Sequence, residues 1–390
     1  MNVCLIHDWL TGMRGGEKVL EVLCRRYPGA PLYTLLHRPG STSPTIERMD
    51  IRTSFLQRVP GVLDHYRYLL PLMPTAIERF RLPADTELVV SSSHAVAKNV
   101  IAPPGAVHVS YCHTPMRYAW DQRADYFGGA ARRSSWSAVR HPLAATRDAI
   151  LDRIRDWDCR ASDRVTHFVA NSGTISARIR RCYDRDSVVI HPPVDTEFYT
   201  QSDTRRDDSY FCISALVPYK RIDLAVQACN RLGRRLIVIG DGPERQRLER
   251  LAGPTVTMLG RQSDEVIRQH YRRCRAMLFP GREDFGITPV EAQACGMPVI
   301  AFGEGGACET VVAPEPATAG GQPGTGLFFH QQTTDALARA ICEFELQPTR
   351  FSAEAARRQA ERFSADRFER ELFAYIEQVV GGKPPLARAA

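Results

Sequence analysis

The stretch from Phe279 to Phe302 constrains the fold of this chain more than any other. It begins with the end of an apolar strand and continues through a polar turn that contains Gly281 and Gly286. Thr288 is predicted to cap the helix that follows. Pro289 suits the first turn of that helix, because a proline there loses no hydrogen bond. The stretch therefore predicts a strand, a glycine-bearing loop and a helix in direct succession.

The same helix is predicted to end near Gly296, and a second apolar strand follows at residues 298–301. A loop of this kind gathers unpaired backbone N–H groups at the positive end of the helix dipole, so it favours an anion. Glu283 in the loop and Glu291 in the helix flank this position. Carboxylates beside a phosphate site are explained if they accept hydrogen bonds from sugar hydroxyls. The pattern therefore favours a nucleotide-sugar as ligand.

A simpler interpretation of the two glutamates remains open. Glu283 would then be a solvated loop acid, and Glu291 would complement the helix dipole.

Composition narrows the class of protein. A length of 390 residues suggests two domains, and a net charge of +7 favours an anionic ligand or membrane surface without deciding between them. The 11 cysteines show no C-x-x-C pair and no metal-ligand spacing, which indicates reduced thiols in a cytoplasmic protein, with disulfides as the alternative. The sequence indicates no signal peptide, no transmembrane run and no nucleic-acid partner.

The first half of the chain alternates predicted strands and helices, as a doubly wound α/β sheet does. Gly15 and Gly16 precede a helix predicted over Glu17–Arg26, where they form either an anion cradle or a tight turn. His113 follows a predicted strand at 107–112, at the end of the sheet where ligands bind. The alternative for His113 is a local hydrogen bond to a loop carbonyl.

Two further regions interleave aromatic and basic residues. Residues 117–141 are predicted to bind an acceptor, because aromatic rings stack on sugars and arginines pair with diphosphates, although a solvated basic loop would look alike. Residues 58–82 are typical either of helices packed on the core or of a membrane interface. Pro71 and Pro74 interrupt any long amphipathic helix there, which favours core packing.

The second half carries a basic pair after its first predicted strand, 210–214. Lys220 and Arg221 can neutralise a diphosphate through charge-assisted contacts worth about 1.5–3 kcal/mol each. The alternative is a basic pair on the surface.

The motifs of the second half resemble the donor-binding signature of retaining glycosyltransferases of family 4, which have the GT-B fold. The matching residues are Glu283-x7-Glu291, Phe285-Gly286-Ile287, Gly296-x-Pro298-Val299-Ile300-Ala301 and Gly305-Gly306-x-x-Glu309. The resemblance covers nearly the whole chain. The segments Ser214–Ala225, His7–Trp9 and Cys112–Pro115 are most similar to bacterial mannosyltransferases of O-antigen and exopolysaccharide assembly.

The resemblance implies an α/β fold of two Rossmann-like, doubly wound domains facing a deep cleft. It places an acceptor-binding domain at 1–199 and a nucleotide-sugar-binding domain at 200–363. A final helix at 364–380 is expected to cross back to the first domain, and a tail at 381–390 is expected to be disordered.

The resemblance implies roles for individual residues. Glu291 would bind the ribose hydroxyls, Glu283 the hydroxyls of the transferred sugar, and His113 would lie near that sugar. Catalytic roles are expected of His113, Glu283 and Lys220; donor contacts of Gly15, Gly16, Lys220, Arg221, Gly260, Arg261, Glu283, Phe285, Gly286, Ile287, Thr288 and Glu291; and acceptor contacts of Arg117, Tyr118 and Trp120.

One position departs from the family pattern. Ala215 stands where an arginine often joins the lysine on the diphosphate, so Arg221 or an arginine of the first domain is expected to compensate. Asp156-Trp-Asp158 and Asp184-Arg-Asp186 lie in helix or turn contexts, which argues against a metal-dependent site. No cofactor and no metal are therefore expected.

The expected function is transfer of a sugar, with mannose from GDP-mannose as the first choice, to a hydroxyl of a glycan or a polyprenyl-linked saccharide. The resemblance implies retention of the anomeric configuration. The protein would be cytoplasmic or peripheral on the inner membrane. Three alternatives stay open: a UDP-sugar-dependent transferase, a GT-B epimerase or hydrolase, and a non-catalytic nucleotide-sugar-binding partner.

Overall fold

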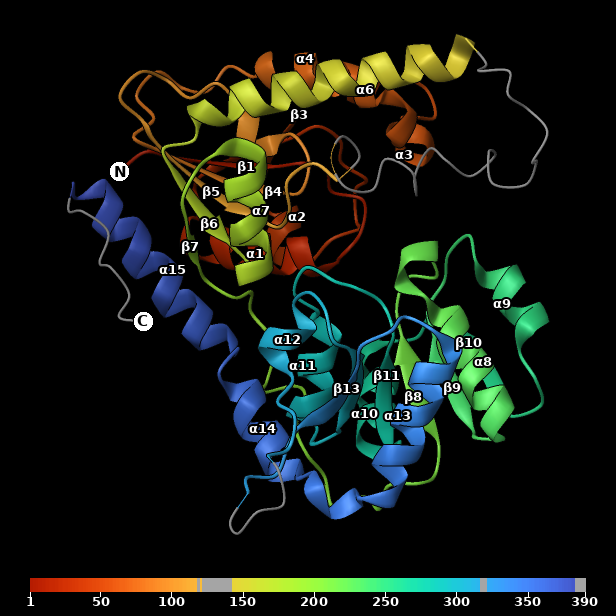
Figure 1. Cartoon of the computed structure of the whole chain (residues 1–390). Coiled ribbons are helices and arrows are strands. Elements are labelled where there is room, and N and C mark those ends of the chain that lie inside the picture. The colour runs from red at the N-terminus through yellow and green to blue at the C-terminus, as the bar shows by residue number, and fades with distance from the viewer. Residues whose placement is uncertain (118–119, 121–141, 316–320, 383–390) are drawn as a thin grey trace. The chain divides into compact units, whose positions relative to one another are not determined.

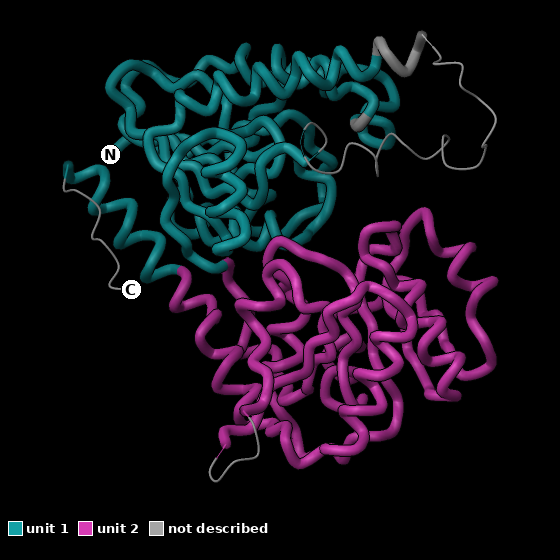
Figure 2. The backbone as a smooth tube through the Cα atoms, in the orientation of Figure 1, with its two compact units in different colours: residues 1–191, 369–390 teal, residues 192–368 magenta. Residues whose placement is uncertain are grey.

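The computed structural model describes residues 1–117, 120, 142–315 and 321–382. The chain divides into two compact units: unit 1 comprises Met1–His191 and Glu369–Ala390, and unit 2 comprises Pro192–Phe368 (Figure 2). The sequence predicts the boundary after residue 199, but in the structure it lies earlier, between His191 and Pro192. The reason is that Val194 pairs with Ser364, and the N–H of Val194 donates to the carbonyl of Phe363. Those partners tie the connecting segment to unit 2.

Unit 1 is built on a seven-stranded sheet in the order β3-β2-β1-β4-β5-β6-β7, and every adjacent pair is parallel (Figure 1). The strands are β1 (Val3–His7), β2 (Pro31–Thr34), β3 (Asp50–Thr53), β4 (Leu88–Ser93), β5 (Val107–Cys112), β6 (His167–Ala170) and β7 (Ser187–Val189). The strand order reverses direction between β1 and β4, which makes that pair the switch point of a doubly wound sheet.

The helices of unit 1 are α1 (Gly15–Arg26), α2 (Pro44–Glu47), α3 (Val62–His65), α4 (Met73–Glu78), α6 (Pro142–Ala161), α7 (Gly173–Tyr183) and the later part of α15 (Ala365–Val380). α15 contacts α1 through Arg25–Glu369 and Arg26–Glu377, at 3.2 and 3.1 Å. Of the expected tail, residues 383–390 lie outside the described residues.

The segment 58–82 packs largely on the core, as the first of its two interpretations requires. α3, a 3-10 helix at Tyr66–Leu72 and α4 bury the apolar side chains of Tyr66, Leu70, Met73, Ala76, Ile77 and Phe80. Tyr68 and Leu72 are exceptions, with exposed fractions of 81% and 45%. No helix in the described part of the chain is long and apolar enough to cross a membrane.

Unit 2 contains a six-stranded parallel sheet in the order β10-β9-β8-β11-β12-β13. The strands are β8 (Tyr210–Ile213), β9 (Leu236–Ile239), β10 (Val256–Gly260), β11 (Ala276–Phe279), β12 (Val299–Phe302) and β13 (Gly326–Phe329). The switch point lies between β8 and β11. Both sheets therefore have the doubly wound, Rossmann-like topology that the sequence predicts.

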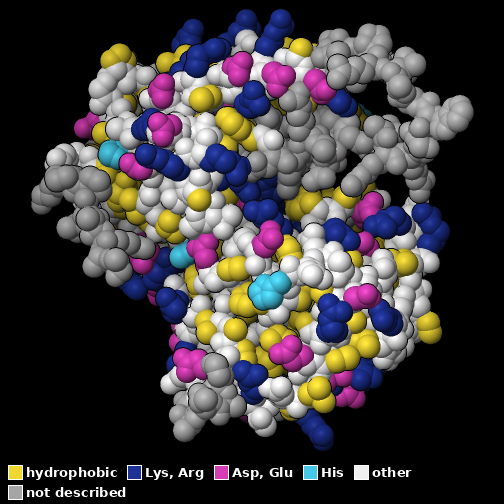
Figure 3. All heavy atoms as spheres, in the orientation of Figure 1, with side chains coloured by type: hydrophobic (Ala, Val, Ile, Leu, Met, Phe, Trp, Pro, Cys, Tyr) yellow, Lys and Arg dark blue, Asp and Glu magenta, His cyan; other side chains and the backbone are white. Residues whose placement is uncertain are grey.

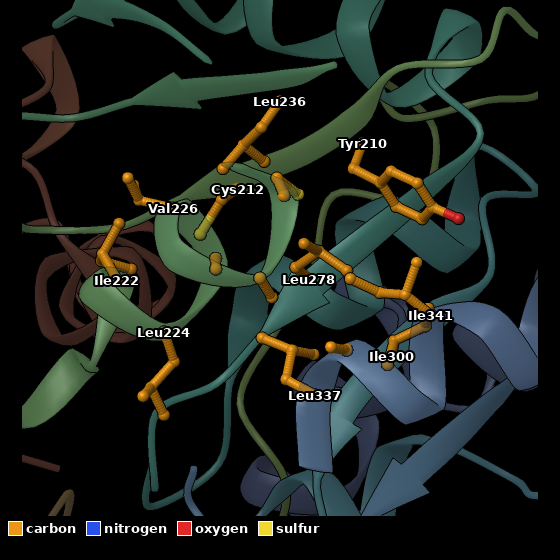
Figure 4. Packing of buried hydrophobic residues seen from close by; sticks show 14 of the residues in the cluster. Tyr210, Cys212, Ile222, Leu224, Val226, Leu236, Leu278, Ile300, Leu337 and Ile341 are labelled. Carbon is orange, nitrogen blue, oxygen red and sulfur yellow. The ribbon is translucent and has the colours of Figure 1, made fainter. Parts of the chain in front are cut away.

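The helices of unit 2 are α8 (Ile222–Leu232), α9 (Arg245–Leu251), α10 (Asp264–Arg273), α11 (Ile287–Ala294), α12 (Ala307–Thr310), α13 (Thr334–Leu346), α14 (Ala353–Glu361) and the start of α15. α8 and α13 pack on the sheet through a buried cluster whose labelled members are Tyr210, Cys212, Ile222, Leu224, Val226, Leu236, Leu278, Ile300, Leu337 and Ile341 (Figure 4). On the face shown in Figure 3, basic and acidic side chains of unit 2 are interspersed.

Candidate active site

In unit 1, predicted site residues gather at the carboxyl ends of β1 and β5, the two strands on either side of β4. His113 directly follows β5, and its Nε2 lies 2.9 Å from the hydroxyl of Ser92 on β4. A Cβ added to Gly16 would lie 3.6 Å from the same Nε2, so the first turn of α1 approaches His113 closely. Gly15 and Gly16 belong to α1, which begins at Gly15 and not at Glu17 as predicted.

Burial, followed by the charges of His94 and His7, holds the pKa of His113 well below its ordinary value of 6.5. The ring is therefore neutral at physiological pH. A neutral imidazole offers one donor and one acceptor nitrogen, which suits it to a sugar hydroxyl.

Asp8, which sequence reasoning missed, is a buried carboxylate at this end of unit 1. It is fully buried and accepts hydrogen bonds from the backbone N–H groups of residues 94–97 at 2.6–3.0 Å. Its Oδ2 also lies 3.2 Å from Nδ1 of His94. A useful signal was present in the sequence: an acidic residue directly after a buried strand, at the switch-point end of the sheet.

Of the three predicted acceptor residues, Arg117 and Trp120 belong to the described part of the chain. Arg117 contributes to the lowered pKa values of His94 and His113, so its charge lies near both rings. The indole N–H of Trp120 donates to Oδ2 of the buried Asp158 at 3.1 Å, which anchors this side chain to α6. Tyr118 lies outside the described residues.

In unit 2, the structure brings Lys220 and Glu283 together at the switch point. Lys220 follows β8 in a 3-10 helix at Pro218–Lys220, Glu283 follows β11, and the two form an ion pair. Gly281 allows this approach, because a Cβ there would lie 2.9 Å from the carbonyl oxygen of Lys220. The pair is partly exposed, with 14% and 18% of the side chains accessible.

The N-terminus of α11 lies in the same loop as Glu283. Its N-cap is Gly286, which has φ +88°, so the prediction that Thr288 caps the helix is wrong. Glycine is favoured there because other residues are strained at positive φ, and Thr288 therefore lies inside the first turn beside Ile287. The ring of Phe285 is buried edge-on against Phe363, so only its backbone is available at the loop.

Glu291 lies one turn into α11 and is 4% exposed. Its Oε2 accepts a hydrogen bond of 3.1 Å from the hydroxyl of Tyr271 on α10, a partner that sequence reasoning did not identify. Burial, followed by the charge of Glu291, raises the pKa of Tyr271 well above 10.0. Tyr271 thus stays protonated and donates to Glu291.

The remaining predicted donor residues lie at the same edge of the unit 2 sheet. Arg221 adopts φ +52°, and its guanidinium pairs with Asp223 at 3.1 Å. Gly260 ends β10, and Arg261 after it is 84% exposed. Ala215 is exposed, so the position of the family's arginine faces solvent here.

The two Asp-x-Asp strings serve structural roles. Asp158 is buried in an ion pair with Lys98, and Asp184 forms the left-handed C-cap of α7. Within the described residues, no three His, Cys, Asp or Glu side chains are arranged to hold a metal ion.

Residues 197–363 match the family model described as "Glycosyl transferases group 1". The matched range lies inside unit 2 and includes Lys220, Glu283 and Glu291. Residues 197–363 form a glycosyltransferase group 1 domain.

Curated relatives are similar to parts of this chain. The chain is 26% identical over 268 residues to the D-inositol 3-phosphate glycosyltransferase of Mycobacteroides abscessus, covering 59% of this chain and 58% of that protein. It is 30% identical over 161 residues to a GDP-mannose-dependent alpha-(1-6)-phosphatidylinositol monomannoside mannosyltransferase of Mycolicibacterium smegmatis, covering 36% and 40%. These alignments span less than two thirds of either relative.

The fold extends beyond the group 1 domain. The sucrose-phosphate synthase of Thermosynechococcus elongatus has a similar structure, with a TM-score of 0.71 and 16% identity, over 98% of this chain and 100% of that one. The chain therefore has the α/β GT-B fold of two Rossmann-like domains.

Proposed function

We propose that this protein transfers a sugar from a nucleotide diphospho-sugar to a hydroxyl of a glycan or a lipid-linked saccharide. The observation that carries the proposal is the ion pair of Lys220 and Glu283 beside the N-terminus of α11, inside a group 1 domain. A cation and unpaired helix amides in one loop suit the charge that develops on a nucleoside diphosphate as it leaves.

The arrangement also suits the sugar parts of such a donor. Glu283 is partly exposed in the loop, and Glu291 lies one turn into α11 with one oxygen held by Tyr271. Each carboxylate has acceptor capacity for vicinal hydroxyls. We assign Glu283 to the transferred sugar and Glu291 to the ribose.

GDP-mannose is the donor that we propose. Several curated relatives, among them the Mycolicibacterium smegmatis mannosyltransferase, are named as GDP-mannose-dependent enzymes. We further propose that transfer retains the anomeric configuration and needs no metal ion, because Lys220 and the amides of α11 supply positive charge without one.

The proposed acceptor is glycan or polyprenyl-linked, and the proposed setting is the inner surface of a membrane. Tyr68 and Leu72, exposed in the 3-10 helix of unit 1, would contact the lipid interface. Flotation with anionic vesicles tests this: Tyr68→Ser with Leu72→Ser should lose vesicle binding, and unchanged binding would contradict the contact.

The first experiment is isothermal titration of the full chain with GDP-mannose, GDP, UDP-glucose and UDP, with and without EDTA. We expect binding of the GDP compounds alone and no effect of the chelator. Lys220→Met should abolish binding, whereas Arg231→Gln, an exposed change on α8, should not. Preference for UDP compounds would overturn the donor, and no binding of any compound would overturn the enzymatic proposal.

Product analysis separates transfer from its rivals. Consumption of donor without any acceptor would indicate an epimerase or hydrolase. An unchanged biological role for Glu283→Gln would indicate a non-catalytic binding partner.

A further inference from the structure

Lys220 is paired with a carboxylate that would compete with any anionic ligand for its charge. The partner is Glu283, which lies 63 positions further along the chain in the loop after β11. The neighbouring cation differs, because Arg221 pairs with Asp223, two positions away, through contacts of 3.1 and 3.3 Å. Of this basic pair, Lys220 therefore has a counter-ion that is itself assigned to the transferred sugar.

The backbone on both sides of the Lys220–Glu283 ion pair is held in place. The carbonyl of Glu283 accepts the N–H of Gly306 at 2.8 Å, and Glu283 also pairs with Gly305 in a parallel bridge. A Cβ at Gly281 would lie 2.9 Å from the carbonyl oxygen of Lys220, so the Glu283 loop packs against the backbone of Lys220. An exchange of partners at Lys220 therefore needs only the rotation of two partly exposed side chains.

A diphosphate that takes Lys220 from Glu283 comes close to a second negative charge. Like charges on either side of one cation repel each other. The repulsion is larger for a free nucleoside diphosphate than for a nucleotide-sugar, because its terminal phosphate can lose a second proton, as phosphate monoesters do with a pKa of about 6. The nucleotide-sugar also brings hydroxyls, which can donate to the carboxylate in place of the ammonium. Glu283 is thus compensated when the donor is bound but not when the product is bound.

We propose that Glu283 competes with the diphosphate for Lys220 and thereby favours release of the nucleoside diphosphate after each transfer. While the donor is bound, the hydroxyls of its sugar hold Glu283 away, and Lys220 serves the diphosphate. Once the sugar has moved to the acceptor, Glu283 loses these hydroxyls and returns to Lys220, so the product is bound less tightly. The inference rests on the proposed function, to which it adds a second task for Glu283.

The affinities of donor and product for the wild-type protein and for Glu283→Gln measure this competition. Titration calorimetry of the full chain at constant ionic strength gives the Kd values of GDP and GDP-mannose, or of UDP and UDP-glucose if that pair binds instead. Glutamine has the size of glutamate without its charge, so Lys220 is left to the diphosphate. We expect the Kd of the nucleoside diphosphate to fall about tenfold, or about 1.4 kcal/mol, since solvent screens this partly exposed pair.

The nucleotide-sugar serves as the internal comparison. Its Kd should not fall in the same proportion, because Glu283→Gln also removes the charged acceptor of the sugar hydroxyls. Glu304→Gln is the matched control: it makes the same change of charge in the neighbouring glycine loop, where Glu304 is 51% exposed and pairs with Arg282 at 3.5 Å. It should change both Kd values by the same factor. Equal tightening of donor and product in Glu283→Gln would overturn the inference.

The rate of product release should change in the same direction. Differences in affinity between variants of one site lie mostly in the dissociation rate. Stopped-flow displacement of a fluorescent nucleoside diphosphate should therefore be slower from Glu283→Gln than from the wild-type protein or Glu304→Gln. An equal or faster release from Glu283→Gln would contradict the role in product release.

A spectroscopic measurement on the wild-type protein keeps the inference testable even if Glu283→Gln does not fold. Labelling with ¹³Cε-lysine gives few signals, because the lysines of the sequence are Lys18, Lys98, Lys220 and Lys383. Comparison with Lys220→Met assigns the signal of Lys220. We expect the nucleoside diphosphate to move this signal and to leave that of the buried Lys98 in place. A Lys220 signal that stays fixed at saturating ligand would overturn the inference, because the diphosphate would then not compete for Lys220.

Failure of this inference and failure of the proposed function give different results. Wild-type protein that binds neither nucleoside diphosphates nor nucleotide-sugars would overturn the proposed function, and this inference with it. Wild-type protein that binds both, with no gain in product affinity in Glu283→Gln, would overturn this inference alone and leave the transferase proposal standing.

Discussion

Lys98 and Asp158 form an ion pair inside unit 1: Nζ lies 2.5 Å from Oδ1, and neither side chain is exposed. The same carboxylate accepts hydrogen bonds from Asn99, Trp120 and Tyr183 at 2.7–3.1 Å. The buried charge of Asp158 thus ties α6 to the 3-10 helix at Ala97–Asn99, to Trp120 and to α7.

Replacing Lys98 should strongly destabilise unit 1. Lys98→Met leaves the charge of Asp158 buried without its cation, which typically costs about 3–5 kcal/mol of unfolding free energy. Urea unfolding measures the change, and Lys18→Met on α1, a partly exposed position, is the control. A loss below about 1 kcal/mol would show that the remaining hydrogen bonds satisfy Asp158 alone.

Asp8 should make stability depend on acid pH. Burial raises the pKa of Asp8, but the charges of His94 and His7 and the backbone donors outweigh it, so the pKa lies below its ordinary 3.8. The stabilisation is therefore complete above that value and is lost as the pH falls through the lower pKa of the folded state.

Chemical unfolding between neutral pH and about pH 3 tests this contribution. Asp8→Asn should lower the stability by about 3 kcal/mol or more at neutral pH and flatten the acid limb of the profile. Asp64→Asn, at an exposed position, should change neither. An unchanged acid limb in Asp8→Asn would show that other carboxylates dominate it.

Glu283→Gln should separate function from stability. The Lys220–Glu283 pair is partly exposed, so its loss should change the unfolding free energy by less than about 1 kcal/mol. Turnover should fall about 10²–10³-fold, because the charge that faces the transferred sugar is gone. Calorimetric melting and initial rates measure the two effects. A large drop in melting temperature with normal turnover would show that Glu283 serves stability and not catalysis.

Tyr271→Phe should weaken both the protein and its donor site. It removes the hydrogen bond to the buried Glu291, a bond to a charged group that is worth about 1.5–3 kcal/mol. Affinity for nucleoside diphosphate should fall as well, because Glu291 loses the contact that orients it. Titration calorimetry and urea unfolding measure these effects, and Tyr375→Phe on α15 is the control. Unchanged affinity would argue against a ribose contact by Glu291.

Gly306→Ala should disrupt the loop that carries Glu283. A Cβ at Gly306 would lie 2.2 Å from Cα of Phe285, a backbone atom that cannot move without shifting the loop. We expect the unfolding free energy to fall by about 1–3 kcal/mol or more, and we expect donor binding to be lost. Gly29→Ala meets nothing within 4 Å and should be close to neutral. Wild-type binding by Gly306→Ala would mean that the loop adapts.

Several features of the fold were predictable from the sequence because their signals are local. The strand predicted at 107–112 coincides with β5, and the strands predicted at 210–214 and 298–301 match β8 and β12 to within one residue at each end. Glu283-x7-Glu291 marked the loop and helix of the proposed donor site. Local signals were weaker at helix starts. Thr288 has the residue type of an N-cap, yet the N-cap of α11 is Gly286, because the backbone there has a positive φ that favours glycine.

The sequence by itself therefore determined the class of fold and the alternation of strands and helices, and it supplied the residues of the proposed nucleotide-sugar site. Only the tertiary structure decided the partners of those residues. His7 meets Ser92, 85 positions away, and Tyr271 meets Glu291 from a different helix. Propensity and spacing act along the chain, whereas a buried polar group must find its partner among whatever side chains packing brings to it, and no local pattern encodes that encounter.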